Sequence, residues 1–344
     1  MRRTLKELTP ISIYSARFAF VCLIIVLAIS LLGPCTKYAQ LNQRRLRVGF
    51  AQIANEGPWR DTNTESIKTE ARRRNVDLKF LESDNPALKG GEQQSGQKEA
   101  LRSFIKERVD VIAFSPVVET GWDDVLNEAK EAGIPVILSD RGVSETDESL
   151  IATFIGSDFV EEGRRAGRWL VDEFEDTQGT VNVIEVEGTR DSAPAMQRHR
   201  GFCEILSRPE YQDRLRVVAW VLGNFNYDQA KAAMRAFLAN NDHQPISAVF
   251  AHSDAMAFAA IAALEEAGFK PGTEIKVVSV DATDKGCNEI KKGRLNCAVE
   301  CKPRLGPALF DAAQAAAKSM ALPERIIISE GVYDKSNVDK CGNE

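Results

Sequence analysis

The sequence predicts an α/β protein of two lobes, each a doubly wound parallel sheet, preceded by an N-terminal apolar segment. Three observations lead to this prediction. From Arg47 onward, short apolar runs rich in β-branched residues alternate with longer segments of helical periodicity, as in parallel sheets covered by helices. The runs number ten, which is more strands than one doubly wound sheet usually holds. An uncharged run also lies near the start of the chain.

The predicted strands fall into two series. The first comprises residues 47–53, 77–82, 110–115 and 135–139. The second comprises residues 151–156, 180–186, 215–222, 247–251, 275–280 and 295–299. Between them, the polar stretch 142–149 lacks apolar periodicity, so the break between the lobes is expected there.

Helical periodicity predicts the elements that cover these strands. The helices are expected at residues 92–108, 121–132, 159–174, 254–267 and 305–320. Two of them are followed by stop signals, Gly133 with Pro135 and Gly268 with Pro271. Glycine takes the left-handed conformation that ends a helix, and proline cannot continue one.

The apolar run at residues 18–33 spans sixteen residues without a charge and follows four basic side chains. It is shorter than the roughly 20 residues of a membrane-spanning helix and has the length of a signal-peptide core. Residues 1–46 are therefore expected to be a signal peptide or a membrane anchor with a linker, and the remainder to be extracytoplasmic. Because no A-x-A cleavage site follows the run, an uncleaved anchor stays an open alternative.

Charge argues against one class of partner. Residues 48–344 hold 36 basic and 49 acidic side chains, a net charge of −13. An acidic surface repels phosphate backbones, so nucleic acid is not an expected partner.

The cysteines and histidines indicate little. A disulfide among Cys287, Cys297, Cys301 and Cys341 fits an exported protein, but the sequence leaves the pairing open. No metal site is expected, because the chain has only three histidines and none stands at ligand spacing with a cysteine.

Polar and aromatic side chains stand where several predicted strands end. They are Glu56, Trp59 and Arg60 after the first strand, Asp140 and Arg141 after the fourth, His252, Ser253 and Asp254 after the eighth, and Asp281 after the ninth. Such sheets bind ligands beyond the carboxyl ends of their strands, so two facing lobes would form a cleft there. The set suits a neutral sugar, whose C–H face stacks on Trp and whose hydroxyls donate to Asp and accept from Arg.

Each of these residues also has an ordinary structural interpretation. An Asp-Arg dipeptide is usually a solvated turn or an ion pair. Trp59 alone fits a core or lobe-edge position, and Asp254 at the start of a helix is most often its N-cap. Their common placement at strand ends favours the ligand interpretation.

Several strings carry a resemblance to a known family. They are VGFAQIANEGPWRDTNTESIK at 48–68, DVIAFSPVVETGW at 110–122, GIPVILSDR at 133–141, GSDFVEEGRRAG at 156–167, AHSDAM at 251–256 and VECKP at 299–303. The chain resembles the type I periplasmic sugar-binding proteins of ATP-binding-cassette (ABC) importers from about residue 47 to 335. Within that family it is most similar to the galactofuranose-binding proteins of the ribose-like pentose/hexose branch.

The resemblance implies lobe bounds and site residues. The lobes would be joined by a hinge that the chain crosses three times: residues 47–152 with about 302–331 form the first lobe, and 153–301 with about 332–344 the second. In this family Arg198 would be the sugar-binding arginine and Phe225 the stacking aromatic. The implied sugar-binding residues are Glu56, Trp59, Arg60, Asp140, Arg141, Arg198, Phe225, Ser253 and Asp281.

Three departures from the family leave the identity of the sugar open. Ser253 stands where relatives commonly carry asparagine, so one ligand bond is lost or replaced by water. Arg190 and Asp191 put charges where relatives carry small residues, and Tyr227 replaces a usual arginine.

The resemblance implies a monomeric solute-binding protein with neither cofactor nor catalysis. It would close on a neutral monosaccharide of the galactofuranose-like pentose/hexose class and deliver it to an ABC permease. An anchored sugar sensor for a chemoreceptor or kinase stays an alternative. A glycoside hydrolase using Asp140 and Asp281 is a weaker one, because the neighbouring arginines would keep both carboxylates ionised.

Overall fold

The computed structural model describes residues 44–82, 90–144, 146–211, 214–240 and 245–342. The chain divides into two units, Met1–Leu46 and Arg47–Glu344, and the second unit is the folded body described below. The predicted signal or anchor run at 18–33 lies outside the described residues. Across the described ranges, no helix has the length and hydropathy that crossing a membrane requires.

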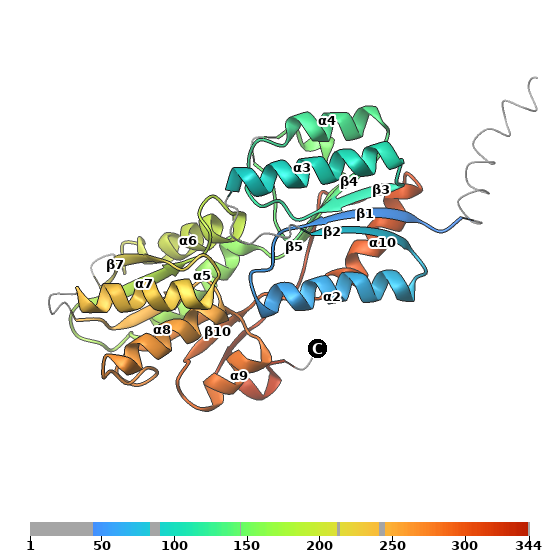
Figure 1. The fold of residues 1–344 in the computed structure, drawn as a ribbon. Helices are drawn as coiled ribbons and strands as arrows, with labels where there is room; N and C mark the ends of the chain where they lie inside the picture. Colours follow the sequence, from blue (N-terminus) through green and yellow to red (C-terminus); the bar gives the residue numbers. More distant parts are fainter. Residues whose placement is uncertain (1–43, 83–89, 145, 212–213, 241–244, 343–344) are drawn as a thin grey trace, which may run out of the picture. The chain divides into compact units, whose positions relative to one another are not determined.

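The first sheet has the strand order β11-β5-β4-β3-β1-β2, and every pairing in it is parallel. Its strands are β1 (Arg47–Gln52), β2 (Asp77–Glu82), β3 (Val111–Phe114), β4 (Val136–Ser139), β5 (Thr153–Gly156) and β11 (Arg325–Ile327). One face is covered by α2 (Pro58–Arg73) and α10 (Gly306–Ala317), which pack against each other (Figure 1). The other is covered by α3 (Gly90–Glu107) and α4 (Asp123–Glu131). We call this sheet and these helices the first lobe.

The second sheet has the order β12-β10-β9-β8-β6-β7, in which only the edge pairing of β12 with β10 is antiparallel among the described strands. Its strands are β6 (Val181–Glu187), β7 (Leu215–Leu222), β8 (Ala248–Ala251), β9 (Lys276–Asp281), β10 (Cys297–Glu300) and β12 (Val332–Asp334). The helices of this second lobe are α5 (Phe159–Glu173), α6 (Ala193–Leu206), α7 (Tyr227–Ala239), α8 (Asp254–Glu266) and α9 (Asp284–Lys291). Short 3-10 turns follow at Glu148–Leu150 in the first lobe and Val338–Lys340 in the second.

Strand β8 explains why the central strands read as unbroken apolar runs. Ala248 and Phe250 belong to the core under α5 and α6, whereas Val249 and Ala251 belong to the core under α7 and α8. All four side chains are buried. A parallel strand covered on both faces needs apolar residues at every position, so its sequence shows no alternation.

The ten predicted strands are present with bounds within two residues of those expected, but one lies in the other lobe. The prediction that residues 151–156 begin the second lobe is wrong, because Thr153–Gly156 pairs with β4 and β11 in the first sheet. The described residues of the polar stretch, 142–144 and 146–149, therefore belong to the first lobe, where they connect β4 to the 3-10 turn before β5. Sequence order does not tell which sheet edge a parallel strand joins, and a long polar loop resembles a linker between domains.

Three segments connect the two lobes: residues 157–158, residues 301–305 and residues 328–331. We call them the first, second and third crossings. Helix α10 returns to the first lobe, where it packs on α2, as the family topology implied. The sequence analysis missed β11 and β12, which have only three residues each and flank the third crossing. Residues 153–156 thus belong to the first lobe. We propose the other lobe bounds as the family resemblance implies them.

The disulfide joins Cys287 to Cys341, with their Cα atoms 5.8 Å apart. This is one of the pairings that the sequence left open, and it ties α9 to the C-terminal 3-10 turn. Cys297 and Cys301 are buried and free.

Helices α5 and α6 pack closely because each has a glycine facing the backbone of the other. A Cβ on Gly163 would lie 2.1 Å from the carbonyl oxygen of Arg198, and one on Gly201 would lie 1.9 Å from that of Val160. No side chain fits at such distances, so the close approach of the two helices depends on both glycines. It also holds Arg198 beside Glu162 of α5.

We expect Gly163→Ala to lower the free energy of unfolding by about 2–3 kcal/mol, because the added methyl group must push α6 away from α5. Urea unfolding followed by circular dichroism measures this loss. Gly96→Ala in α3 is the matched control, since no atom lies within 4 Å of its Cβ position. The control should be neutral or slightly stabilising, and an equal loss in both variants would contradict the packing argument.

Candidate functional site

A cavity of about 720 Å³ lies where the carboxyl ends of strands from both sheets meet. This volume is within the range of small-molecule sites. All nine predicted site residues line it: Glu56, Trp59, Arg60, Asp140, Arg141, Arg198, Phe225, Ser253 and Asp281. The structure therefore brings together residues from both lobes that are more than 200 positions apart in the sequence.

The first-lobe wall is a network of two arginines and two carboxylates. Arg60 donates from Nη2 to Oδ2 of Asp140 at 2.6 Å, and Arg141 donates from Nη2 to Oε2 of Glu56. Cross pairs are longer, with Arg60 Nη2 3.9 Å from Glu56 and Arg141 Nε 3.9 Å from Asp140. Ser115 donates to the same Asp140 oxygen at 3.2 Å. The network fixes both guanidinium groups at the cavity.

Three nitrogen atoms of this network have no hydrogen-bond partner among the described residues: Arg60 Nε, Arg141 Nε and Arg141 Nη1. Arg141 is only 2% exposed and lines the cavity. Burial lowers the pKa of Arg141, and the nearby Glu56 carboxylate opposes that effect. A buried donor without an acceptor is costly, which makes these groups candidates for hydrogen bonds to a ligand.

Three site residues have backbone conformations in the left-handed region: Asp140, with φ of 69°, Phe225, with 54°, and Asp281, with 117°. Non-glycine residues adopt such conformations rarely, and those that do cluster at functional sites. Two glycines make room for two of these residues, Asp140 and Phe225. A Cβ on Gly156 would lie 2.8 Å from the carbonyl oxygen of Asp140, and one on Gly188 would lie 2.0 Å from the ring of Phe225.

Arg198 forms the centre of the second-lobe wall. It donates from Nε to Glu162 at 2.7 Å and from Nη1 to the carbonyl oxygen of His252 at 2.6 Å. Its guanidinium carbon lies 5.1 Å from the ring of Phe159 and 5.9 Å from that of Phe225. Burial alone would lower the pKa of Arg198, but the carboxylates of Glu162 and Asp281 raise it above its usual value. Arg198 is therefore a fixed cation between two aromatic rings.

Ser253 and Asp254, which follow β8, have structural roles that differ from those considered in the sequence. Ser253, rather than Asp254, is the N-cap of α8 and accepts from the Met256 backbone N–H at 3.3 Å. Asp254 instead accepts from Ser279 at 2.5 Å and from the backbone N–H of Thr283 at 2.8 Å, which fixes the turn after β9. The structural alternative that Asp254 is the N-cap is therefore set aside, because α8 begins at Asp254, as predicted, and its cap is the preceding residue, Ser253.

Asp281 lies at the end of β9 and accepts from the backbone N–H of Asp254 at 3.2 Å. Burial raises its pKa well above the usual range, and the neighbouring Asp254 carboxylate raises it further. The nearby Arg198 guanidinium opposes both effects on the pKa of Asp281.

Trp59 connects the first lobe to the second crossing. Its indole N–H donates to the carbonyl oxygen of Cys301 at 2.7 Å, and the Arg60 guanidinium carbon lies 4.8 Å from the ring. The ring is half-buried and lines the cavity. Stacking of Trp59 on a sugar stays a prediction.

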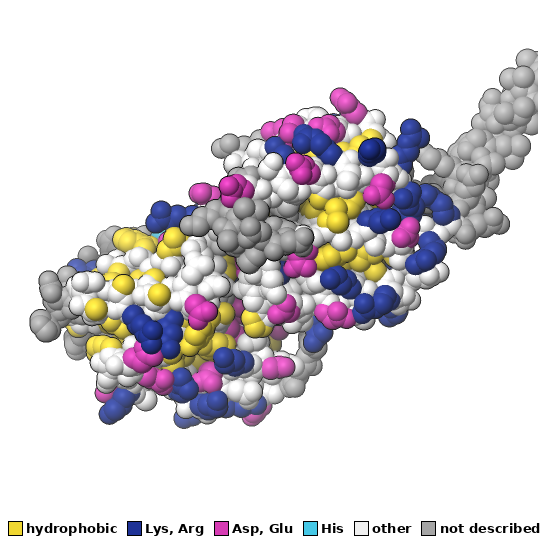
Figure 2. Space-filling view, viewed as in Figure 1, with side chains coloured by type: hydrophobic (Ala, Val, Ile, Leu, Met, Phe, Trp, Pro, Cys, Tyr) yellow, Lys and Arg dark blue, Asp and Glu magenta, His cyan; other side chains and the backbone are white. Residues whose placement is uncertain are grey.

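Sequence reasoning missed three aromatic residues at the cavity: Phe159, Tyr227 as a wall residue, and Phe258. Phe159 is the first residue of α5, directly after the first crossing, so the strand-end rule would have found it once β5 was placed correctly. Tyr227 begins α7 and Phe258 lies within α8. Figure 2 shows hydrophobic side chains on the surface of the second lobe around α7 and α8.

The two lobes also contact each other beside the cavity. Gln197 of α6 donates to the Glu119 carboxylate at 2.8 Å, and the Glu119 backbone N–H donates to the carbonyl oxygen of Asp191 at 3.3 Å. Thr189 lies 3.5 Å from Glu56 across the same divide. Residues 189–197 thus meet the first lobe at the rim of the cavity.

A two-lobed α/β body with three crossings and a cavity lined by charged and aromatic side chains has a direct counterpart in known proteins. The sequence matches the periplasmic binding protein domain over residues 48–320. This chain belongs to that family. Periplasmic binding proteins are solute-binding proteins rather than enzymes, so the hydrolase alternative is set aside and the predicted resemblance is confirmed.

Individual periplasmic binding proteins extend the comparison. A galactofuranose-binding protein of Escherichia coli K12 is 35% identical over 286 residues, which cover 83% of this chain and 86% of the relative. A solved structure from Mycobacterium smegmatis, in complex with β-D-fucofuranose, is 45% identical with a TM-score of 0.79 and covers 86% of this chain and 93% of its own. The binding protein of an arabinose ABC transporter from Shewanella sp. ANA-3, bound to α- and β-L-arabinofuranose, is 38% identical with a TM-score of 0.78, covering 85% and 93%.

Proposed function

We propose that this chain is an extracytoplasmic binding protein that captures a neutral monosaccharide in its furanose form and delivers it to the permease of an ABC importer. The nine cavity residues named above would hold the sugar, and residues 1–46 would serve as export signal or membrane anchor. The proposal rests chiefly on one observation: Arg60 and Arg141, whose buried charge network includes three nitrogen atoms without a hydrogen-bond partner among the described residues, both line the cavity.

The chemistry of the cavity favours a neutral, hydroxyl-rich ligand. The three predicted site arginines are each paired with a carboxylate, Arg60 with Asp140, Arg141 with Glu56 and Arg198 with Glu162, so none of them is left as an unpaired charge for an anion. Sugar hydroxyls can accept from the free N–H groups and donate to the same carboxylates. The furanose form is favoured because the two solved relatives named above carry furanoses.

Contacts between the lobes support capture by closure. The bond from Gln197 to Glu119 and the approach of Thr189 to Glu56 join the lobes at the rim of the cavity. A ligand that touches both walls would favour the arrangement in which these contacts form, and the closed lobes would present one surface to a permease.

A thermal-shift and calorimetry screen of the full chain tests the proposal. Free L-arabinose, D-fucose and D-galactose each equilibrate with a furanose fraction, whereas their methyl pyranosides are locked in the six-membered ring. At a hundredfold excess over the dissociation constant, a bound sugar adds about 2.7 kcal/mol of stability, which raises Tm by several degrees. We expect such a rise from at least one free sugar and none from its methyl pyranoside. No shift with any free sugar, or an equal shift with the locked ring, would overturn it.

A further inference from the structure

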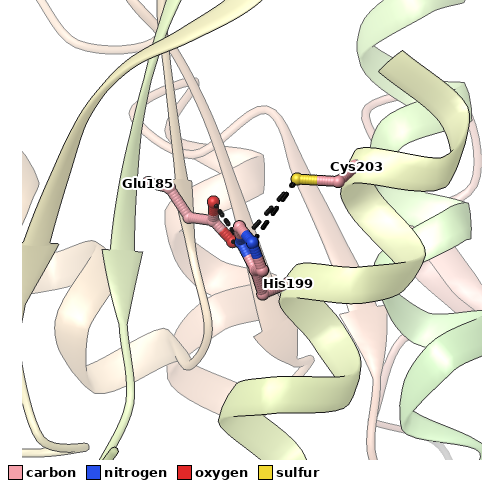
Figure 3. Close-up of side chains that lie close together, drawn as sticks. All are labelled: Glu185, His199 and Cys203. Carbon is pink, nitrogen blue, oxygen red and sulfur yellow. Dashed lines mark hydrogen bonds and ion pairs between the residues drawn. The ribbon is translucent and has the colours of Figure 1, made fainter. Parts of the chain in front are cut away.

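Outside the sugar cavity, three side chains with different metal-binding groups meet on the second lobe. Glu185 projects from β6, and His199 and Cys203 project from α6 (Figure 3). The Nδ1 atom of His199 lies 2.9 and 3.1 Å from the two carboxylate oxygens of Glu185. The Cys203 sulfur lies 3.8 Å from Nδ1 and 3.7 Å from Nε2 of the same ring. None of the three lines the cavity.

The spacing of these residues suits a common ligand set. His199 and Cys203 are four residues apart, so they lie on one face of α6. The expectation that no histidine stands at ligand spacing with a cysteine is wrong for this pair. One ligand atom from each of the three residues lies within 4.8 Å of the others.

These separations are close to those of a tetrahedral site. Zinc binds thiolate sulfur at about 2.3 Å and imidazole nitrogen at about 2.0–2.1 Å, which places the two ligand atoms about 3.5 Å apart. The sulfur-to-nitrogen separations of 3.7 and 3.8 Å therefore need to shorten only slightly. The carboxylate and imidazole, now at hydrogen-bond distance, would open to about 3.3 Å.

The surroundings orient the carboxylate and leave the other two groups accessible. Glu185 is fully buried and accepts from His252 Nε2 at 2.9 Å, while the backbone N–H of Gly188 lies 3.5 Å from His252 Nδ1. That arrangement puts the His252 proton on Nε2 and holds the carboxylate in place, as an outer-shell partner does for a metal ligand. The His199 side chain is 38% exposed, and Cys203 is half-buried, so an ion can reach them.

A fourth donor stands nearby on the same strand. Glu187 follows Glu185 by two residues, so both side chains lie on one face of β6. Its carboxylate lies 4.0 Å from His199 Nδ1. Thiolate, imidazole and carboxylate together suit borderline-soft divalent ions rather than calcium or magnesium, which prefer oxygen alone.

We propose that Glu185, His199 and Cys203 bind a zinc-class divalent ion, with Glu187 as the nearest fourth ligand. The site is independent of the proposed sugar binding, because its three ligands lie outside the cavity and on one lobe.

The test uses the full chain, stripped with a chelator and titrated with Co²⁺ and then Zn²⁺. We expect one equivalent of Co²⁺, a thiolate-to-cobalt charge-transfer band in the near ultraviolet, and displacement of that band by Zn²⁺. Cys203→Ser should remove the band, and His199→Asn should weaken Zn²⁺ binding by at least about tenfold. Glu204→Gln is the matched control, since Glu204 neighbours Cys203 on α6 but pairs with Arg164 instead.

A second measurement does not depend on whether the variants fold. Zn²⁺ should slow alkylation of Cys203 in the wild-type chain, as followed by peptide mass spectrometry. No bound equivalent, a cobalt complex without the thiolate band, unchanged Zn²⁺ affinity in Cys203→Ser and His199→Asn, or unprotected Cys203 would each overturn the proposal.

Discussion

Replacing Arg141 by alanine is expected to weaken binding of the sugar by at least about a hundredfold while the protein stays folded. Arg141 lines the cavity, and its Nε and Nη1 atoms have no hydrogen-bond partner among the described residues, while each charged hydrogen bond to a ligand contributes about 1.5–3 kcal/mol. Losing both therefore removes several kcal/mol of binding free energy. Isothermal titration calorimetry with the sugar found in the screen measures the loss.

The fold should tolerate this change because the remaining charges keep partners. Asp140 still accepts from Arg60 and Ser115, and Glu56 has a side chain that is 22% exposed, so water can solvate it. Arg141→Lys separates charge from shape, since lysine keeps the charge but loses the planar fork, and it should recover little affinity. Arg102→Ala is the control: this arginine lies on α3 in exposed pairs with Asp124 and Glu128. Unchanged affinity in Arg141→Ala would defeat the site assignment.

The sequence predicted the strands well because their physical signature is local. Each central strand is buried on both faces and therefore reads as a short apolar run, as in VIAF of β3 and AVFA of β8. The strand-end rule then selected Asp140, Arg141 and Asp281, all of which line the cavity. Local patterns and one topological rule were sufficient for these residues.

What the sequence could not predict depends on contacts between distant segments. The lobe to which β5 belongs is set by its pairing with β4, and the partner of Cys287 is set by where the C-terminal turn folds back. No local sequence pattern marks Gly188 as part of the site, yet the ring of Phe225 fits only because glycine has no Cβ at this position. Apolar periodicity did not predict the third crossing, because β11 and β12 have only three residues each and are too short to show such a pattern.

That third crossing contains Glu330, whose carboxyl group joins all three connections between the lobes. Its Oε1 atom accepts from Ser157 of the first crossing at 2.6 Å and from the Lys302 backbone N–H of the second at 2.9 Å. Burial raises the pKa of Glu330 to about 8, and the Glu162 carboxylate adds to the shift, while the hydrogen bonds from Ser157 and Lys302 and the charge of Arg198 oppose it. The crossings thus share one carboxyl group that holds its proton at neutral pH.

Glu330 should make the folded state less stable as pH rises. The unfolded chain releases this proton near the ordinary value of 4.5, whereas the folded protein keeps it until about 8. Between these values the folded state binds more protons, so the free energy of unfolding falls as pH rises and levels off above about 8. The full loss should be about 5 kcal/mol, since the pKa differs by about 3.5 units between the two states and one unit corresponds to about 1.4 kcal/mol.

We expect Glu330→Gln to remove this dependence. Glutamine resembles the protonated carboxyl group in shape and can accept the same two hydrogen bonds, so the variant should match the wild type at pH 5 and be more stable at pH 9. Urea unfolding across this interval gives the difference, in which the other titrating groups cancel. Glu324→Gln neutralises an exposed carboxylate shortly before the same crossing and should leave the slope unchanged. If the free energies of unfolding of Glu330→Gln and the wild type changed in parallel with pH, Glu330 would be ionising at its ordinary pKa in the folded protein. The three crossings would then not share a neutral carboxyl group.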